Sequence, residues 1–220
     1  QYAKMPAYNL IVNNSNIDPK YLSIQEPLGN AMHTMMHFDI VDKTVAVVGC
    51  GPIGLMGVNI AKAVGSKKII AIEVNPYRIK LAKELGAHVV INPLEEDVIK
   101  RVFEETNGKG VDVVTEFSGN KTAIEQAFKY VKPGGKMSLL GIFDANIDID
   151  VSNDIVFKGI TIYGVVGRLM FKTWDQVTLM VQSGKLDLEK IVTHTFPLDQ
   201  MEEAMKVMMS GHSGKVVLIP

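Results

Sequence analysis

The chain has 220 residues, of which 47% are hydrophobic and 21% charged, so it can form a sizeable core and is not a disordered chain. Lysine and arginine nearly balance aspartate and glutamate, the formal net charge is -1, and no basic run stands out. Nucleic acid is therefore not an expected partner. The single cysteine, Cys50, excludes an internal disulfide and a Cys-x-x-Cys zinc site, and it is consistent with a reducing, cytoplasmic location.

The apolar stretch at residues 44–64 is long enough to be considered as a membrane span. Pro52, several glycines, Asn59 and Lys62 interrupt it, and its first part is typical of a buried strand followed by a helix. We therefore expect no membrane partner.

From residue 44 onward, short β-branched runs alternate with amphipathic segments. Six runs are typical of strands, and the first of them is typical of a buried strand: 44–49, 67–73, 88–92, 111–119, 136–143 and 159–166. Five segments have helical patterns: 52–65, 76–86, 94–108, 122–131 and 172–184. Strands alternating with helices over about 130 residues predict an α/β protein with a doubly wound parallel sheet, the Rossmann fold.

Several local features refine this pattern. We expect Glu95, Glu96 and Asp97 in the first turn of the helix at 94–108, where the helix dipole favours acids. The Pro-Gly-Gly sequence at 133–135 predicts a turn before the fifth strand. Near the end of the chain, four methionines at helical spacing predict adaptable core packing: Met201, Met205, Met208 and Met209.

The strongest candidate site is a glycine motif between the first strand and the first helix of this pattern. It reads Gly49-Cys50-Gly51-Pro52-Ile53-Gly54, a G-x-G-x-x-G sequence. In such a motif the first glycine permits a tight turn, the second lets the backbone approach a pyrophosphate, and the third lets helix and strand pack closely. The positive end of the helix then faces the phosphates. The motif predicts a dinucleotide site, with a methyltransferase sheet as the less favoured alternative.

An acid in the expected place supports this interpretation. Glu73 ends the second strand, 24 positions after Gly49 (73 − 49), near the spacing of about 20 for the acid that binds ribose hydroxyls. An acid here favours NAD over NADP, because it would repel a 2′-phosphate. Arg78 could lie against the adenosine, could support a 2′-phosphate, or could be a solvated surface residue. Ser118 after the fourth strand and Leu140-Gly141-Ile142 after the fifth should face the same ligand crevice.

Further segments point to a known family. The sequences GPIGLM, EVNPYR and LLGIF resemble those of zinc-type medium-chain alcohol dehydrogenases. GRLMFKTW at 167–174 and EPLGNA at 26–31 are more discriminating and resemble the threonine-oxidising members. The resemblance implies a full-length enzyme that oxidises the β-hydroxyl of L-threonine, or of a similar small alcohol, with NAD. It also implies a catalytic zinc that polarises the alcohol, a homo-oligomer, tetrameric in the family, and a cytoplasmic enzyme.

The resemblance also assigns roles to individual residues. Glu26 matches an acidic position beside the catalytic zinc that acts in proton relay or in positioning the metal. The cofactor contacts that it implies are Ile53, Glu73, Arg78, Leu140, Gly141, Ile142, Val165 and Val166. Together with Gly49, Gly51, Pro52, Gly54 and Ser118 from the motif and the strand ends, these form the expected cofactor site.

The sequence departs from the family in one large respect. The family's catalytic domain, which carries the zinc ligands, is missing, so we expect no metal site in this chain and no turnover by it alone. Residues 1–23 suggest a strand and a turn without a partner, and the last segment suggests a helix and a strand. We therefore divide the chain into a remnant of the GroES-like catalytic domain at 1–25, an NAD-binding domain at 26–192, and a segment returning to the catalytic domain at 193–220.

Alternatives stay open at this point. A polyol or butanediol dehydrogenase of the same fold is the nearest, and a stand-alone NAD-binding module without chemistry is the other. His33 and His37 are four residues apart on an expected helix, where packing is favoured over metal binding. Cys50 is a small filler of the turn or, less favoured, a reactive thiol. The strand at 159–166 could pair across a subunit boundary, because a bare sheet edge invites pairing.

Overall fold

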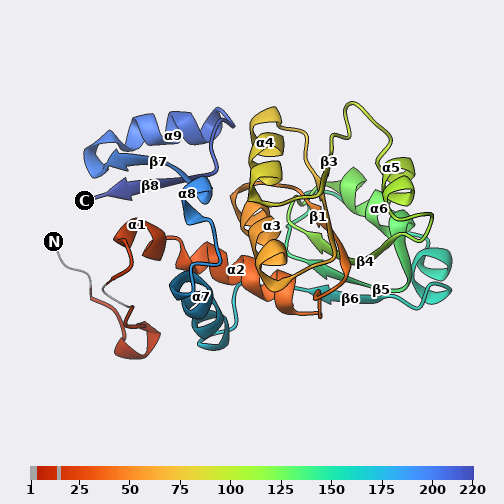
Figure 1. The fold of residues 1–220 in the computed structure, drawn as a ribbon, viewed down its shortest axis with the longest axis horizontal. Coiled ribbons are helices and arrows are strands. Elements are labelled where there is room, and N and C mark those ends of the chain that lie inside the picture. Colours follow the sequence, from red (N-terminus) through yellow and green to blue (C-terminus); the bar gives the residue numbers. More distant parts are fainter. Residues whose placement is uncertain (1–3, 14–15) are drawn as a thin grey trace.

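The computed structural model describes residues 4–13 and 16–220. Its main feature is a sheet of six parallel strands in the order β3-β2-β1-β4-β5-β6, flanked by helices on both faces (Figure 1). The strands are β1 Thr44–Val48, β2 Lys68–Ile72, β3 Val89–Ile91, β4 Val111–Glu116, β5 Val131–Leu139 and β6 Thr161–Gly164. The order reverses between β1 and β4, as in a doubly wound sheet. The predicted Rossmann fold is confirmed.

Two hydrophobic clusters cover the two faces of this sheet. Val45 and Val47 of β1 belong to one cluster with helices α2, α3 and α4, and Ala46 and Val48 belong to the other with α5 and α6. Because both faces of the central strands β1 and β2 are buried, these two strands are almost continuously apolar rather than alternating, whereas the edge strand β6 is mostly exposed. The helices are α1 Pro19–Leu22, α2 Gln25–Met36, α3 Pro52–Val64, α4 Pro76–Leu85, α5 Val98–Glu105, α6 Lys121–Tyr130, α7 Lys172–Gln182, α8 Leu188–Ile191 and α9 Met201–Met209.

Helix α5 begins later than predicted. Asp97 is its N-cap and accepts a 3.0 Å hydrogen bond from the amide of Lys100, so the helix starts at Val98. Glu95 and Glu96 lie in a preceding turn, where their amides donate to the carbonyl of Asn92. The expectation that these acids lie in the first turn is wrong, because a side-chain cap at Asp97 sets the start of the helix.

Strand β5 also starts differently from the prediction. It begins at Val131 and runs through residues 133–135, with a shift of register against β4 between Val111 and Val113. Gly134 has a φ of 71° and donates a 2.7 Å hydrogen bond to the carbonyl of Lys158. The Pro-Gly-Gly sequence is therefore an irregular start of the strand, not a separate turn.

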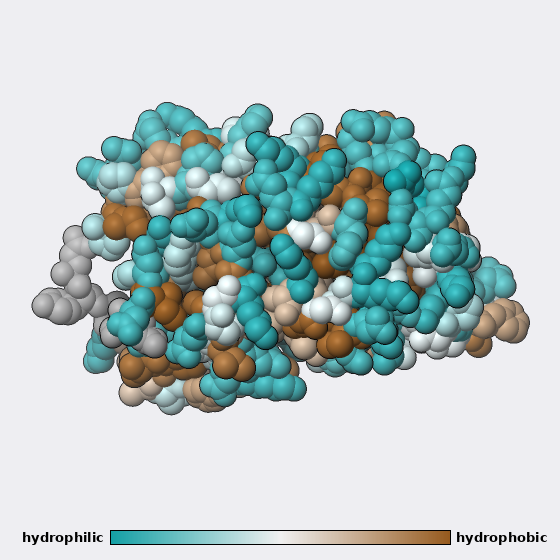
Figure 2. Space-filling model, in the orientation of Figure 1, coloured by the Kyte–Doolittle hydropathy of each residue, from teal (hydrophilic) through white to brown (hydrophobic). Residues whose placement is uncertain are grey.

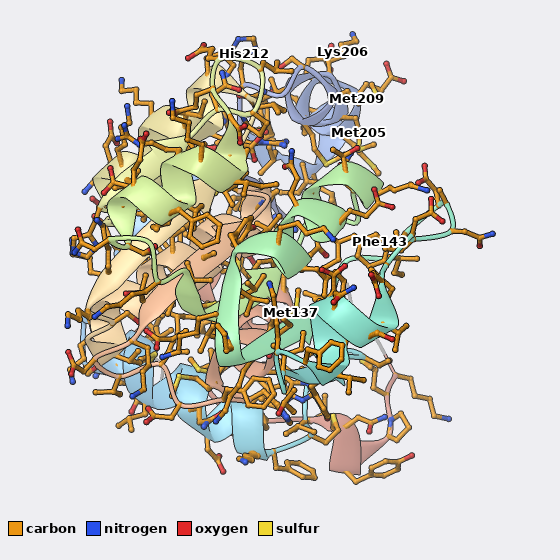
Figure 3. The ribbon with its side chains drawn as sticks, turned by 90° about the vertical axis from the view of Figure 1, so that its right-hand side faces the viewer. Met137, Phe143, Met205, Lys206, Met209 and His212 are labelled. Carbon is orange, nitrogen blue, oxygen red and sulfur yellow. The ribbon has the colours of Figure 1, made fainter. Side chains whose placement is uncertain are left out.

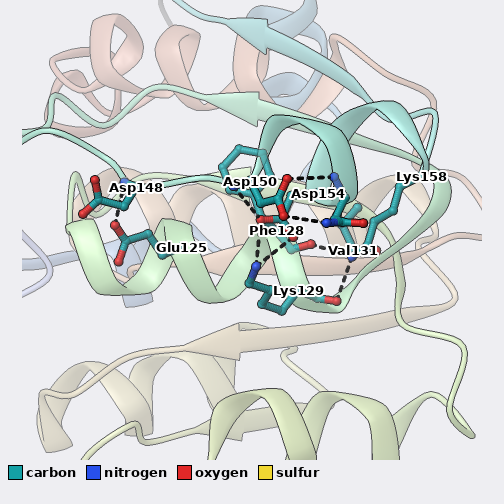
Figure 4. A network of polar contacts seen from close by, with 9 residues as sticks. Glu125, Phe128, Lys129, Val131, Asp148, Asp150, Asp154 and Lys158 are labelled. Carbon is teal, nitrogen blue, oxygen red and sulfur yellow. Dashed lines mark hydrogen bonds and ion pairs between the residues drawn. The ribbon is translucent and has the colours of Figure 1, made fainter.

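A network of polar contacts lies where α6 ends and β5 begins (Figure 4). It joins α6 to the π-helix η2, Val151–Val156. Lys129 Nζ lies 2.8 and 2.7 Å from the two carboxylate oxygens of the buried Asp154. Lys158 Nζ donates to the carbonyls of Phe128, Lys129 and Val131 at 2.6, 2.9 and 3.2 Å. This ammonium group therefore satisfies carbonyls where α6 ends and β5 begins.

The described part of residues 1–23 contains no strand, so the strand expected there is wrong. It forms a 3-10 helix, η1 Ala7–Asn9, and the short helix α1, which Asp18 caps through the amide of Lys20. Pro6 directly precedes η1, and Pro19 is the first residue of α1. At both positions a proline favours the start of a helix over a strand.

The C-terminal segment forms a second sheet of two parallel strands, β7 Val192–Pro197 and β8 Lys215–Ile219, joined by the 3-10 helix η3 Leu198–Gln200 and by α9 (Figure 1). The predicted helix and terminal strand are therefore present. Figure 3 shows Met205 and Met209 on α9. The four methionines are exposed by 38% to 72%, so their predicted core packing is wrong for this chain. Helical spacing places them on the helix but does not decide what the helix packs against.

On the face shown in Figure 2 hydrophilic side chains predominate, and apolar patches lie among them, including at the end of the molecule that holds α1, α7 and β8. The loop before α7 and α7 itself carry exposed apolar side chains: Leu169, Met170, Phe171 and Leu179. Within residues 4–13 and 16–220, no helix is both long and apolar enough to span a membrane.

Candidate functional site

The glycine motif forms a tight turn between β1 and α3. Gly49 has a φ of 82°, and a Cβ at this position would lie 2.7 Å from Ser118 Cβ. A Cβ on Gly54 would overlap the carbonyl oxygen of Gly49. The first and third glycines are therefore required by the left-handed backbone and by close packing within the turn.

Gly51 differs from these two glycines. It is the N-cap of α3, with a φ of -59°, and a Cβ built on it would meet nothing within 4 Å. Neither backbone strain nor packing within this chain requires a glycine here. Open space above the first turn of a helix, with free amides and the positive end of the dipole, is the arrangement that binds a phosphate. The turn therefore fits the pyrophosphate of a dinucleotide.

Glu73 lies directly after β2 and is bound to the same turn. Its Oε2 accepts a 2.7 Å hydrogen bond from the amide of Cys50, and its Oε1 accepts from the amides of Val74 and Asn75, both at 2.9 Å. The residue is only 7% exposed. A carboxylate can accept about four hydrogen bonds. Three backbone donors therefore fix its position and leave capacity for a further donor such as a ribose hydroxyl.

A cleft of about 530 Å³ opens at these residues. It brings together five of the predicted site residues: Gly49, Gly51, Glu73, Arg78 and Ser118. Its wall also contains residues that the sequence analysis did not single out: Val48, Ile72, Val74, Pro93, Leu94, Phe117, Asn120, Thr122, Ala123 and Gln126. Their common signal is position, because they end or follow the strands β1 to β4 at the carboxyl edge of the sheet, where ligands bind, or belong to α6 and its N-cap.

Arg78 lies in the first turn of α4, where its amide donates to the side chain of Asn75 at 3.2 Å. Its guanidinium Nε is buried and has no hydrogen-bond acceptor among the described residues. The side chain lines the cleft next to Glu73. A buried donor without a partner is costly, so a ligand that accepts a hydrogen bond from this group would be stabilised. The Arg78 guanidinium is therefore available to bind a ligand in the cleft.

The remaining predicted cofactor residues lie outside the wall of this cleft. Pro52, Ile53 and Gly54 form the first turn of α3 beneath the glycine turn. Leu140, Gly141 and Ile142 follow β5, and the amides of Leu140 and Gly141 donate to the carbonyl of Glu116 at 2.9 and 3.3 Å.

Two further predicted residues follow β6. Val165 is buried and continues the pairing of β6 through a 2.8 Å bond to Leu139, whereas Val166 is 92% exposed. Ile142 is 93% exposed. The chain thus presents two apolar side chains at the ends of β5 and β6.

Glu26 lies in the first turn of α2 and forms an ion pair with Arg168 of the loop after β6. Arg168 Nη1 donates to Glu26 Oε1 at 2.8 Å, and the guanidinium carbon lies 5.0 Å from the centre of the Trp174 ring. Arg168 belongs to the family segment at 167–174 but was not predicted as a site residue. No spacing rule links positions 26 and 168; only the fold brings them together.

A second cleft, of about 550 Å³, lies between the α1 region and the α7–α8 region. Its wall carries three acids, Asp18, Asp187 and Glu189. It contains none of the predicted site residues. We favour the cleft at the glycine turn as the functional site, since it combines the phosphate-binding turn, a fixed carboxylate and a free guanidinium.

Metal ligands do not gather in the part of the chain that the structure describes: no three His, Cys, Asp or Glu side chains lie together. His33 Nδ1 lies 2.9 Å from the carbonyl of Gly167, and the ring of His37 stacks on Tyr163 at 3.4 Å. Cys50 is fully buried, and burial, followed by the charge of Glu73, raises the pKa of its thiol. These residues do not fit a zinc site.

The family of the chain follows from comparison with known sequences. A family model described as "Zinc-binding dehydrogenase" matches residues 52–183, more than half of the chain. The chain is 51% identical, over 221 aligned positions, to an L-threonine 3-dehydrogenase from Caldanaerobacter subterraneus subsp. tengcongensis. The alignment covers 100% of the chain but only 64% of that relative.

Solved structures agree with this result. The 2R,3R-butanediol dehydrogenase of Bacillus subtilis superposes with a TM-score of 0.87 at 29% identity, covering 94% of this chain and 60% of that one. A zinc-binding dehydrogenase from Sinorhizobium meliloti 1021, solved bound to NADP, superposes with a TM-score of 0.85 at 25% identity, over 94% and 61% of the two chains. The chain therefore belongs to the zinc-binding dehydrogenase family.

Proposed function

We propose that this chain is the NAD-binding part of a longer enzyme that oxidises the β-hydroxyl of L-threonine to 2-amino-3-oxobutanoate. The observation that carries the cofactor assignment is the bonding of Glu73 to the glycine turn, next to the open first turn of α3. The identity of 51% to an L-threonine 3-dehydrogenase along the whole chain supports the substrate. The chain spans 64% of that relative, so the activity is a proposal for the longer protein.

The residues of the cleft have distinct roles in this proposal. The amides at the start of α3 bind the pyrophosphate, and Gly51 leaves room for it. Glu73 accepts hydrogen bonds from the hydroxyls of the adenosine ribose. In this proposal the nicotinamide half lies over the ends of β4 and β5, beside Ser118 and Ile142, and the strand order β2-β1-β4-β5 supports this assignment. When bound, NAD supplies the acceptor for the hydride; the protein binds and orients it.

The choice between NAD and NADP depends on two neighbouring residues. A 2′-phosphate would lie against the carboxylate of Glu73, which is held in place by three amides and cannot turn away without breaking them. Among the described residues that line the cleft, Arg78 is the one cation that could bind a 2′-phosphate, and its unpartnered Nε can instead contact the adenosine. We therefore propose NAD as the cofactor.

The Glu26–Arg168 pair would lie at the substrate end of the longer enzyme. In this proposal Glu26 takes part in proton relay or in placing the metal, and Arg168 holds its carboxylate through the 2.8 Å bond. The catalytic zinc that the family resemblance implies does not fit the described residues. Its ligands would have to come from outside them. The cytoplasmic location and the tetrameric assembly, with pairing at the edge strand β6, also remain proposals, as does the division at residues 25 and 192.

The test is calorimetric titration of the 220-residue chain with NAD and with NADP, with the zinc content measured on the same sample. Binding of NAD that is at least tenfold tighter than that of NADP, without zinc, is the expected result. Absence of binding to both would contradict the cofactor assignment, and stoichiometric zinc would contradict the assignment of the metal ligands to other parts of the protein.

The structural similarity to butanediol dehydrogenase makes 2,3-butanediol the second candidate substrate. It rests on 29% identity, against 51% for the threonine enzyme. Steady-state rates of the longer enzyme with L-threonine and with 2,3-butanediol distinguish the two, and a higher kcat/KM for the diol would overturn threonine as substrate. A chain of full length that binds NAD and oxidises neither alcohol would favour the stand-alone binding module.

A further inference from the structure

Glu116 is the last residue of β4 and is fully buried at the carboxyl edge of the sheet. Its Oε1 accepts hydrogen bonds from the amides of Ser118 and Gly119, at 2.7 and 3.0 Å, and from the hydroxyl of Ser118. No ion pair to this carboxyl is present among the described residues. A buried carboxylate is costly unless hydrogen bonds compensate it, so three donors on one oxygen indicate that this loop is built around the acid.

The same residue also contacts the loop after β5. Its backbone carbonyl accepts from the amides of Leu140 and Gly141. Its side chain lies so close to Gly141 that a Cβ there would overlap Glu116 Oε2. A Cβ on Gly119 would lie 2.5 Å from the carbonyl oxygen of Ile142, so the two loops also touch each other. Glu116 therefore fixes both loops at once.

A third contact connects this arrangement to the glycine turn. A Cβ on Gly49 would lie 2.7 Å from Ser118 Cβ and 2.9 Å from Ser118 Cα, so Ser118 packs directly against the turn. Displacement of Ser118 by a change at Glu116 would consequently reach the surface of the cleft. The side chain of Glu116 itself is covered and does not line the cleft.

The position of these loops in the sheet decides which part of a dinucleotide they would contact. Glu73 follows β2, the glycine turn follows β1, and Ser118 and Gly141 follow β4 and β5, on the other side of the point where the strand order reverses. A dinucleotide lies across that point. With the adenosine ribose at Glu73 and the pyrophosphate at the glycine turn, the loops held by Glu116 lie under the nicotinamide half.

We propose that Glu116 is a positioning residue for the nicotinamide half of the cofactor, holding the loops at 117–120 and 140–142 in the geometry that this half requires. The proposal rests on the proposed NAD-binding function. Burial raises the pKa of the Glu116 carboxyl, against the lowering effect of the hydrogen bonds that Ser118 and Gly119 donate to it. Oε2 has no hydrogen-bond partner, and the nearby Tyr130 hydroxyl is likewise buried without one.

The experiment compares the affinities for NAD and for ADP, which lacks the nicotinamide half, in calorimetric titrations of the chain. Glu116→Gln keeps the shape of the side chain but replaces a charged acceptor with a neutral one and places an amide nitrogen beside Gly141. Its NAD affinity should fall roughly tenfold, since bonds to charged groups are the stronger ones. Its ADP affinity should stay within about twofold of that of the unaltered chain.

Asp112→Asn is the matched control, because Asp112 lies on the same strand, is paired with Lys132, and is at the other end of β4, outside the wall of the cleft. This variant should lose stability without changing the ratio of NAD to ADP affinity. A merely structural role of Glu116 would behave like the control. If E116Q does not fold, Glu116→Asp is the test variant. Its shorter side chain keeps the charge but withdraws the carboxylate oxygen from Ser118 and Gly119. This variant should likewise lower the ratio of NAD to ADP affinity.

The outcomes separate the two proposals. If the unaltered chain binds NAD more tightly than ADP and the Glu116 variants keep that ratio, the positioning role is wrong and the cofactor assignment stands. If the unaltered chain binds NAD no more tightly than ADP, the loops contribute nothing to the nicotinamide half, and the positioning role is again wrong. If it binds neither nucleotide, the cofactor assignment is wrong and the role of Glu116 is overturned with it.

Discussion

The amide of Cys50 donates a 2.7 Å hydrogen bond to the carboxylate of Glu73 and so ties the glycine turn after β1 to the acid after β2. Two parts of the candidate site that are separated by 23 residues are thereby held in a fixed relation without any ligand. Such preorganisation favours binding, because little has to be ordered when the ligand arrives.

The first prediction concerns this carboxylate. In Glu73→Ala, the backbone amides of Cys50, Val74 and Asn75 lose their acceptor, so the free energy of unfolding should fall by roughly 2 kcal/mol. The affinity for NAD should fall by about tenfold or more, and the preference over NADP should relax, because the repulsion of a 2′-phosphate is gone. Urea denaturation and calorimetric titration measure the two effects.

Glu202→Ala is the control for this variant. Glu202 is an exposed acid of α9 and takes part in none of the ion pairs of the described residues. Its change should alter neither NAD affinity nor stability by more than about 0.5 kcal/mol. A Glu73→Ala variant that bound NAD as tightly as this control would contradict the assignment of the ribose contact.

The second prediction separates the glycines of the turn. Gly51→Ala should fold with unchanged stability, to within about 0.5 kcal/mol, since its φ suits any residue and a Cβ meets nothing. Its NAD affinity should nevertheless fall by at least about tenfold, because the methyl group occupies the approach of the pyrophosphate. Gly54→Ala should instead lose roughly 2 kcal/mol of stability or more, because its Cβ overlaps the Gly49 carbonyl.

Thermal unfolding and NAD titration of both variants check this contrast. A Gly51→Ala variant that binds NAD normally would show that the ligand does not lie over the first turn of α3. A Gly54→Ala variant with unchanged stability would show that the turn can open to accept the methyl group.

The third prediction concerns the thiol of Cys50. Burial raises the pKa of this thiol, and its side chain is fully covered, so the nucleophilic thiolate should be scarce in the native protein. Reaction with a disulfide reagent at pH 8 should be at least about 100-fold slower in the native chain than in denaturant. Rapid native labelling would favour the alternative of a reactive thiol at the helix start.

The sequence was sufficient for the features that depend on local pattern. The strands were predicted from continuous apolar runs, and the turn from three glycines whose roles are set by backbone geometry within six residues. Glu73 could be found because the length of one strand–helix–strand unit fixes the spacing between the glycine turn and the acid.

Features that depend on packing partners could not be predicted in this way. The methionines of α9 have the spacing of a buried face, yet they are exposed, since periodicity does not reveal what covers a helix. The contact of Arg168 with Glu26 joins residues 142 positions apart. Glu116 looks like an ordinary strand end in the sequence, and only its burial and its three donors distinguish it.

The fourth prediction uses the two carboxyls of β4, whose pKa shifts have opposite signs. Burial tends to raise the pKa of Asp112, but the Lys132 ammonium and the Thr44 amide lower it below its ordinary value of 3.8. Asp112 therefore stabilises the fold above pH 3.8, and this contribution is lost as the pH falls through the lowered pKa. Burial raises the pKa of Glu116 above 4.5, so its protonated form favours the fold, and that advantage is lost as the pH rises from 4.5 through the raised value.

Urea denaturation at pH 3, 5 and 7 tests both signs. Asp112→Asn should be destabilised by about 1 kcal/mol at pH 7, and by less at pH 3. The stability of Glu116→Gln relative to the unaltered chain should increase as the pH rises above 4.5. Parallel pH profiles for the two variants would contradict the opposite shifts.

The fifth prediction concerns the network where α6 meets β5 (Figure 4). Lys158 Nζ donates to three carbonyls at this junction, one of them at 2.6 Å, and burial lowers its pKa. In Lys158→Ala these carbonyls lose their donor, so the free energy of unfolding should fall by roughly 1–2 kcal/mol, while NAD affinity stays unchanged because the junction lies at the opposite edge of the sheet from the glycine turn. Lys109→Ala, which removes an exposed lysine after α5, is the control and should have almost no effect on stability. Equal stabilities of the two variants would mean that solvent replaces the Lys158 ammonium, and that the end of α6 is held by the ion pair of Lys129 with Asp154 instead.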